Sequence, residues 1–176
     1  YRLVSLKKIK KYTPGFNIHD IQKKYNLKKV IKLASNENPF ISKDVLSFIK
    51  KSNHKLNLYP DSNPDELHKL LANTVGHRMS SNNIILGNGS NEILEFIVRA
   101  NVDDKSEVII PKHSFLVYEI ISKLQNAKII TTKPENDKSS ENYLGINLKS
   151  VEEKITKNTK LIFIANPANP TGTYIK

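Results

Sequence analysis

Residues 166–173 combine two Asn-Pro pairs with a Thr-Gly turn, directly after the apolar run 161–165. Proline restricts its own backbone and that of the residue before it, so this loop should be rigid. Its polar side chains should face one point at the carboxyl end of a strand, where open α/β sheets bind ligands. The spacing therefore predicts a ligand site after this strand.

A second segment, residues 87–92, joins a glycine turn to the start of a helix. Gly87 and Gly89 allow a sharp turn and a close approach of the backbone to a ligand, while Ser90 and Asn91 place N–H groups at the positive end of the helix. These features favour a phosphate group. The segment lacks the Gly-Lys-Ser/Thr of a Walker loop and the third glycine of a dinucleotide fingerprint, and Ser90 has no nucleophile-elbow context. A tight turn with an ordinary cap is the structural alternative.

The composition indicates a globular protein. The chain has 176 residues, of which 38% are hydrophobic and 26% charged, so it can bury a core as one domain or as part of a larger one. No run approaches the roughly 18 apolar residues that a membrane span needs, and the basic opening lacks the apolar core of a signal peptide. Cysteine is absent, which excludes disulfides and thiol chemistry. We expect a cytoplasmic protein with no membrane partner.

The formal net charge of +11 raises the question of a nucleic-acid partner. The lysines are spread along the whole chain, arginines are few, and no basic, aromatic-rich strand is present. We interpret the charge as solvated surface and expect no nucleic acid; salt-sensitive retention on duplex DNA would favour the opposite interpretation. The five histidines show no ligand spacing, so we expect no metal.

Helices and strands are predicted to alternate. The predicted helices cover residues 18–26, 43–51, 64–75, 90–100, 114–125 and 148–157, and the predicted strands cover 31–34, 83–86, 107–110, 127–132 and 161–165. Ser42 is expected to cap the second helix. Asn63, Pro64 and Glu66 are expected to open the third with a cap and a capping box. The alternation is typical of an α/β fold, with a mostly parallel sheet and helices on both faces.

Four blocks of this sequence resemble histidinol-phosphate aminotransferases in their order and spacing. They are Lys32–Pro39 (KLASNENP), Leu58–Asp61 (LYPD), Gly87–Glu92 (GNGSNE) and Asn166–Gly172 (NPANPTG), and Tyr12-Thr13-Pro14-Gly15 also fits. These enzymes are fold-type I proteins that use pyridoxal 5′-phosphate. The resemblance implies an amino-terminal arm and small-domain portion in residues 1–57. It implies an incomplete large cofactor-binding domain in residues 58–176.

The resemblance also assigns roles to residues of the glycine turn and of the helix that follows the next strand. Gly89 would let the backbone approach the cofactor phosphate, and Ser90 and Asn91 would bind that phosphate. Phe115 corresponds to an aromatic ring stacked on the cofactor's pyridine, unless the neighbouring His113 takes that place.

Further roles follow by resemblance outside that turn. Asn169 corresponds to an asparagine that hydrogen-bonds the ring hydroxyl of the cofactor, and Tyr59 to a tyrosine that reaches the cofactor phosphate of the partner subunit, which implies a homodimer. Asn36 and Glu37 would lie near the substrate entrance. Each assignment has a structural alternative: Phe115 as core packing, Tyr59 as a surface turn residue, and Asn169 as support for its turn.

Two groups that transamination needs do not appear in the expected place. The Schiff-base lysine and a carboxylate that keeps the pyridine nitrogen protonated follow the Asn-Pro-Thr-Gly turn in this family. Three upstream matches to the lysine's Ser-x-x-Lys pattern are interpreted as coincidences: Ser5–Lys8, Ser47–Lys50 and Ser52–Lys55. We therefore expect the lysine and a substrate-binding arginine after Lys176. The chain would be the amino-terminal half of an enzyme, with no catalytic residue and negligible transaminase activity of its own.

The implied reaction of the full-length enzyme is amino transfer between histidinol phosphate and 2-oxoglutarate, giving imidazole acetol phosphate and glutamate in histidine biosynthesis. The alternatives are another class I/II enzyme, such as an aromatic aminotransferase or a phosphothreonine decarboxylase, and a non-catalytic remnant that binds the cofactor. An Asp-x-x-Tyr and Ser-x-x-Lys pair beyond Lys176 would favour the enzyme over the remnant.

Overall fold

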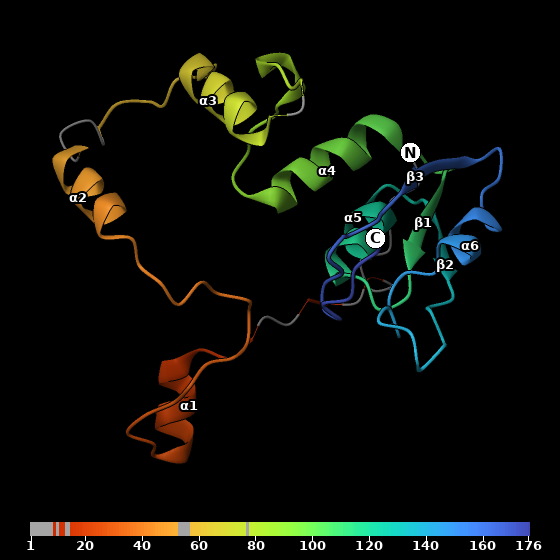
Figure 1. Cartoon of the computed structure of the whole chain (residues 1–176), viewed down its shortest axis with the longest axis horizontal. Helices are drawn as coiled ribbons and strands as arrows, with labels where there is room; N and C mark the ends of the chain where they lie inside the picture. Colours follow the sequence, from red (N-terminus) through yellow and green to blue (C-terminus); the bar gives the residue numbers. More distant parts are fainter. Residues whose placement is uncertain (1–8, 10, 13–14, 53–56, 77) are drawn as a thin grey trace. The chain divides into compact units, whose positions relative to one another are not determined.

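The computed structural model describes residues 9, 11–12, 15–52, 57–76 and 78–176 (Figure 1). The predicted motif residues outside this part are Ser5, Lys8, Thr13, Pro14 and Lys55. The chain forms two compact units, which we call the helical unit (residues 13–84) and the sheet unit (residues 85–176 with 1–12). The predicted boundary between residues 57 and 58 refers to the domains of a complete aminotransferase and stays a prediction.

The sheet unit is built on three parallel strands in the order β2-β1-β3. The strands are β1 (Glu107–Pro111), β2 (Lys128–Thr132) and β3 (Thr159–Ile162), and the helices are α4 (Ser90–Asn101), α5 (Leu116–Leu124) and α6 (Leu148–Glu152). In the register, Ile109 of the central strand lies opposite Ile130 and Ile162. Parallel strands need crossover connections, and α5 lies in the connection from β1 to β2, whereas α6 lies in the connection that carries the chain from β2 across β1 to β3.

Successive side chains of β1 enter cores on opposite faces of the sheet. Val108 and Ile110 belong to a cluster that includes residues of α4 and α5. Ile109 packs on the other face with Ile146 and with Val151 of α6, and Figure 1 shows α5 and α6 on opposite sides of the strands. All residues of β1 are buried, as expected for a central strand covered on both faces. The predicted α/β fold with a parallel sheet is confirmed.

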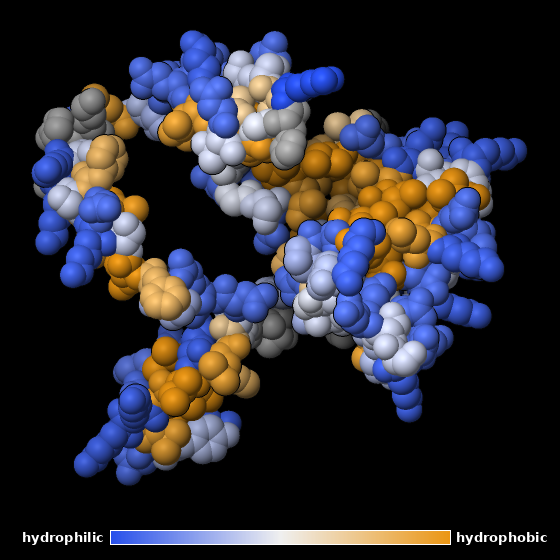
Figure 2. Space-filling model, in the orientation of Figure 1, coloured by the Kyte–Doolittle hydropathy of each residue, from blue (hydrophilic) through white to orange (hydrophobic). Residues whose placement is uncertain are grey.

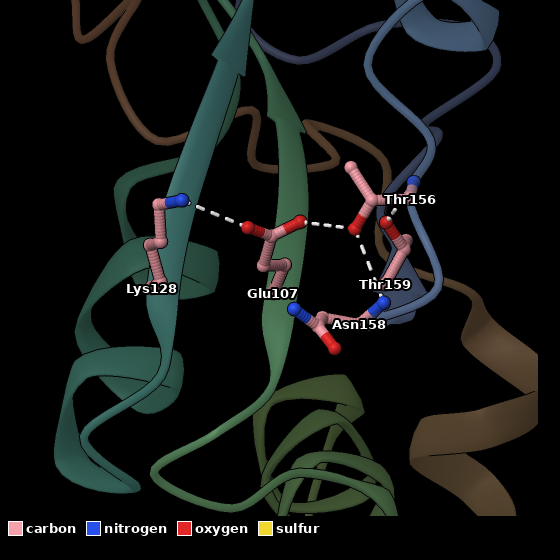
Figure 3. A network of polar contacts seen from close by, with 5 residues as sticks. All are labelled: Glu107, Lys128, Thr156, Asn158 and Thr159. Carbon is pink, nitrogen blue, oxygen red and sulfur yellow. Dashed lines mark hydrogen bonds and ion pairs between the residues drawn. The ribbon is translucent and has the colours of Figure 1, made fainter.

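A polar network closes the amino end of the sheet (Figure 3). Glu107, the first residue of β1, is only 6% exposed. Its Oε1 lies 2.8 Å from Lys128 Nζ, and its Oε2 accepts a hydrogen bond from Thr156 Oγ1 at 2.6 Å. The Thr156 N–H donates to Thr159 Oγ1 at 2.9 Å, and Thr156 Oγ1 accepts the Asn158 N–H at 3.1 Å. The hydrogen bonds from Lys128 and Thr156 hold the pKa of Glu107 below its ordinary value.

The helical unit contains α1 (Ile18–Tyr25), α2 (Lys43–Ser52), α3 (Asp65–Val75) and the 3₁₀ helix η3 (Ser81–Asn83). Ser42 caps α2 as predicted, because its Oγ accepts the Val45 N–H at 3.3 Å. Figure 2 shows apolar side chains on the surface along the segments that contain α1 and α2. The most exposed of these are Phe16, Ile31, Leu33, Phe40, Ile41 and Phe48. Apolar surface of this extent is typical of segments that pack against further protein.

Several predictions about local structure are wrong. Residues 31–34 are not a strand, and the strand predicted at 83–86 begins in η3 and continues as unpaired chain. Ile84 is extended, with φ −118° and ψ 131°, but a strand also requires a paired neighbour, and neither segment pairs with any described residue. The predicted cap of α3 fails because the Asn63 amide donates to Asp65 Oδ1 at 2.8 Å instead of accepting an N–H.

Two further elements differ in length or position from the prediction. The helix predicted at 148–157 ends at Glu152, and the strand predicted at 161–165 covers Thr159–Ile162. The helices α1 to α5 and the strands β1 and β2 agree with their predicted ranges to within two residues.

Candidate functional site

The glycine turn before α4 has the backbone shape of an anion cradle. Gly89, the N-cap of α4, has φ 80° and ψ 169°, a combination essentially restricted to glycine. A Cβ on Gly89 would meet no atom of the described chain within 4 Å beyond its own neighbours, so the turn is open there. The N–H groups of Ser90 and Asn91 belong to the first helical turn, which lacks intrahelical acceptors and carries partial positive charge. These residues fit a phosphate group.

The inner side of this turn is held by Glu92. Its Oε2 accepts the Asn88 N–H at 2.7 Å, and both carboxylate oxygens lie 3.3 Å from Asn88 Nδ2. Gly87 leaves the necessary space, since a Cβ there would lie 2.8 Å from Glu92 Oε2 and 2.7 Å from Ile93 Cδ1. Gly87 also accepts the Gly89 N–H at 2.8 Å. The N–H groups of Asn88 and Gly89 are therefore satisfied inside the turn.

Phe115 is the N-cap of α5 and follows the loop that leaves β1. Its half-buried ring makes edge contacts with Tyr12, at a centroid distance of 6.4 Å, and with Tyr118, at 5.8 Å. Tyr118 in turn stacks on Phe163 at 4.3 Å. His113, the alternative stacking residue, is exposed and has a left-handed backbone with φ 64°. Among the described residues, aromatic rings contact Phe115 and not His113, which favours Phe115 as the stacking residue.

A cavity of about 200 Å³ opens beside Phe115. It is lined by the end of β1, residues 111–114, the start of α5, and Ile129 and Thr131 of β2. This volume is below the roughly 300–1,000 Å³ of typical ligand pockets, so the cavity could contribute only part of a cofactor site.

The Asn-Pro loop after β3 is closed by Asn166. Its Nδ2 donates to the Ile175 carbonyl at 3.0 Å, and its Oδ1 accepts the Ile175 N–H at 2.9 Å. Inside the loop, the Ala168 N–H donates to the Thr173 carbonyl at 2.7 Å, and the Gly172 N–H donates to the Ala168 carbonyl at 2.8 Å. Both Asn-Pro peptide bonds are cis. The loop is thus held in place by its own hydrogen bonds.

Asn169 differs from Asn166 although both precede a proline. Its side chain is exposed and makes no hydrogen bond with any residue that the structure describes. A free amide is what a ligand-binding asparagine requires, since it retains both a donor and an acceptor. The structure therefore separates a supporting asparagine from one that is available to a ligand.

The sheet unit contains the glycine turn, Phe115 and Asn169. β1 and β3 are neighbouring parallel strands, so the loops that follow them leave the same edge of the sheet. Phe115 follows the loop after β1, Asn169 lies in the loop after β3, and the glycine turn begins the helix that precedes β1. The predicted cofactor residues of these three segments thus belong to one compact unit, and their individual roles stay predictions.

The other predicted site residues lie in the helical unit. Glu37 Oε1 pairs with Lys32 Nζ at 2.5 Å, beside a cavity of about 430 Å³ that residues 15–18 also line. Asn36 has a left-handed backbone with φ 47°. Tyr59 is 100% exposed. The predicted roles of Asn36, Glu37 and Tyr59 stay predictions.

The described ranges contain no group of three or more His, Cys, Asp or Glu side chains that could hold a metal ion. They also contain no helix of the length and apolarity needed to cross a membrane.

Three residues that shape the site were missed in the sequence, although each carried a signal. Glu92 occupies the third position of α4, where a capping-box acid is expected. Tyr118 follows Phe115 by three residues, which places the two side chains on one side of a helix. Asn166 repeats the Asn-Pro pattern of Asn169.

Comparison with known proteins supports one family. The family profile described as aminotransferase class I and II matches residues 28–176. Histidinol-phosphate aminotransferase 1 of Idiomarina loihiensis is 39% identical over 173 residues, which make up 97% of this chain and 44% of that protein. The histidinol-phosphate aminotransferase of Desulfotalea psychrophila is 37% identical over 175 residues, or 98% of this chain and 43% of that protein. The chain thus spans less than half the length of these curated relatives.

Solved structures share the fold. The alanine aminotransferase of Pyrococcus furiosus has a TM-score of 0.73 at 23% identity, over 89% of this chain and 41% of that chain. The aspartate aminotransferase of Rhizobium meliloti has a TM-score of 0.72 at 21% identity, over 89% of this chain and 40% of that chain. Because the family profile covers most of the sequence, including the glycine turn and the Asn-Pro loop, this chain belongs to the class I and II aminotransferase family.

Proposed function

We propose that the protein containing this chain is a pyridoxal-phosphate-dependent aminotransferase of histidine biosynthesis, which transfers an amino group between histidinol phosphate and 2-oxoglutarate. One observation carries the proposal. An open glycine turn at the start of α4 and an internally held Asn-Pro loop lie in one unit of a chain that is 39% identical to a histidinol-phosphate aminotransferase.

The residues of this chain would bind and orient the cofactor. When bound, pyridoxal 5′-phosphate supplies the electron sink for amino transfer. The N–H groups of Ser90 and Asn91 would bind its phosphate, and the backbone of Gly89 would allow the close approach. Phe115 would lie against the ring face. The free amide of Asn169 would donate a hydrogen bond to the ring hydroxyl oxygen.

The proposal includes a cytoplasmic homodimer with shared sites. The full exposure of Tyr59 supports a reach toward the cofactor phosphate of a second subunit. The exposed apolar side chains along α1 and α2 support burial against further protein. Asn36 and Glu37 would line the substrate entrance, with Glu37 oriented by its ion pair with Lys32.

Substrate kinetics on the intact, cofactor-loaded protein test this function. Glutamate formation from 2-oxoglutarate is followed with histidinol phosphate, phenylalanine or tyrosine as the amino donor. We expect kcat/KM for histidinol phosphate to exceed that for the aromatic amino acids by about 100-fold, because a site built for a polar group rejects donors that leave it unpaired. A preference for the aromatic donors would favour an aromatic aminotransferase. Release of carbon dioxide from phosphothreonine would favour the decarboxylase, and cofactor binding without turnover would favour a non-catalytic protein.

A further inference from the structure

Glu92 folds back past the usual target of a capping-box acid. A glutamate at the third helical position normally accepts the N–H of the N-cap residue. In this turn the N-cap is Gly89, whose N–H donates to the Gly87 carbonyl at 2.8 Å. Glu92 Oε2 instead accepts the Asn88 N–H at 2.7 Å. The two backbone donors immediately before α4 are therefore consumed inside the turn.

The next donors along the chain are the N–H groups of Ser90 and Asn91. Both residues are exposed, and first-turn N–H groups have no acceptor within their own helix. An anion that approaches the turn would meet these two donors and not those of Asn88 and Gly89. A carboxylate free to move at this helix end would compete for the same positive charge. The contacts of Glu92 with Asn88 keep its carboxylate inside the turn.

Gly87 leaves the space that the Glu92 carboxylate occupies in the turn. A Cβ at this position would lie 2.8 Å from Glu92 Oε2 and 2.7 Å from Ile93 Cδ1, closer than real Cβ atoms come to other atoms. The absence of a side chain at Gly87 therefore makes room for the carboxylate.

We propose that Glu92 is a positioning residue for the cofactor phosphate. It holds the turn of residues 87–89 in the shape that presents the Ser90 and Asn91 N–H groups to that phosphate. The inference rests on the proposed function, because it takes the ligand of the turn to be the phosphate of pyridoxal 5′-phosphate.

The test compares two ligands that differ only in the phosphate. Dissociation constants of the intact apo-protein are measured for pyridoxal 5′-phosphate and for pyridoxal by fluorescence titration. In Glu92→Ala we expect affinity for pyridoxal 5′-phosphate to fall about ten-fold, from the loss of a charge-assisted hydrogen bond. Affinity for pyridoxal should change less than about two-fold, since pyridoxal lacks the phosphate that the turn would bind. Glu92→Gln retains an acceptor for the Asn88 N–H and should stay within about three-fold of the wild type.

A matched control and a second variant accompany this comparison. Glu95 lies on the same helix, and its Oε1 is 2.7 Å from Arg99 on the surface, so Glu95→Ala should leave both affinities unchanged. Gly87→Ala keeps the Glu92 carboxylate but displaces it, and should weaken phosphate-dependent binding as Glu92→Ala does. If circular dichroism shows that Glu92→Ala is unfolded, the comparison of Gly87→Ala with Glu92→Gln carries the test.

The possible outcomes separate this inference from the proposed function. A wild-type protein without preference for pyridoxal 5′-phosphate over pyridoxal would overturn the phosphate site, and the role of Glu92 with it. A wild-type preference that persists in Glu92→Ala or Gly87→Ala would overturn the positioning role alone. So would a complete loss of the preference in Glu92→Gln.

Discussion

Glu107 and Thr156 are joined by a 2.6 Å hydrogen bond although 49 positions separate them in the sequence. Glu107 opens β1, and Thr156 lies in the turn before β3. The second carboxylate oxygen of Glu107 pairs with Lys128 of β2 at 2.8 Å. One nearly buried carboxylate thus links β1 both to β2 and to the approach to β3, at the amino end of the sheet (Figure 3).

The contribution of Glu107 to stability should disappear in acid. Its hydrogen bonds with Lys128 and Thr156 hold its pKa below the ordinary value of 4.5. A carboxyl whose pKa is lower in the folded state stabilises the fold fully above its unfolded pKa, and this stabilisation is lost as pH falls through the folded pKa. Urea unfolding of the wild type and Glu107→Gln between about pH 7 and pH 3 measures the effect. The difference in unfolding free energy should shrink below about pH 4.5, and a constant difference would contradict the prediction.

Asn166 and Asn169 form a matched pair for mutation. Asn166→Ala removes two hydrogen bonds to Ile175 and should lower the unfolding free energy by about 1–2 kcal/mol. Asn169→Ala removes no side-chain hydrogen bond to a described residue and should change this free energy by less than about 0.5 kcal/mol. Titration with pyridoxal 5′-phosphate should show the reverse order of effects: Asn169→Ala should lose about ten-fold in affinity, more than Asn166→Ala. Equal stability losses in the two variants would contradict the separation of their roles.

Gly145 should not tolerate even a methyl group. A Cβ at this position would overlap Asn142 Oδ1 and lie 2.5 Å from Thr173 Oγ1. Gly145→Ala should therefore lower the unfolding free energy by about 1–3 kcal/mol, as overpacking does. The double variant Gly145→Ala/Asn142→Ala removes the nearest obstacle and should recover part of this loss. Strictly additive costs in thermal unfolding would argue against the clash.

Phe115 and His113 can be distinguished by cofactor binding. Phe115→Ala should weaken binding of pyridoxal 5′-phosphate by about ten-fold, because it removes a ring that Tyr12 and Tyr118 support. Phe115→Tyr keeps a ring and should bind nearly as the wild type does. His113→Ala should leave the affinity unchanged, because the imidazole is exposed and takes part in none of the ring contacts among the described residues. A larger loss for His113→Ala than for Phe115→Ala, by absorbance titration, would reverse the assignment.

The elements α4, α5, β1 and β2 of the sheet unit were predictable because their apolar residues find partners within the same unit, whereas α6 and β3 differ from their predicted ranges. The apolar run at β1 pairs with partners on both sides, and the apolar faces of α4 and α5 meet the same core. Residues 31–34 carry a similar apolar signal, yet Leu33 is 92% exposed and no described neighbour pairs with the segment. An apolar sequence pattern indicates that a segment can adopt an extended backbone, whereas a strand also needs a neighbouring strand to pair with, which the pattern does not identify.

In the candidate site, the residue types were predictable from the sequence, but which residues support the loops and which stay free for a ligand was not. The glycine turn was expected to face a phosphate, and the open side of Gly89 agrees with that shape. The turn's dependence on Glu92 follows from hydrogen bonds that only the folded backbone defines. The two Asn-Pro pairs are alike in sequence. Only the folded structure shows that Asn166 supports the loop, through its hydrogen bonds with Ile175.

The hydrogen bonds of Asn166 are made within the chain, so the Asn-Pro loop becomes ordered when the chain folds and not when a ligand binds. Fixing one residue's backbone costs about 1–2 kcal/mol of conformational entropy. A ligand that reaches Asn169 therefore meets a preorganised partner, and less of its interaction energy is offset by ordering the loop. Affinity at Asn169 is thereby linked to the stability of a hydrogen-bonded pair that the ligand need not touch.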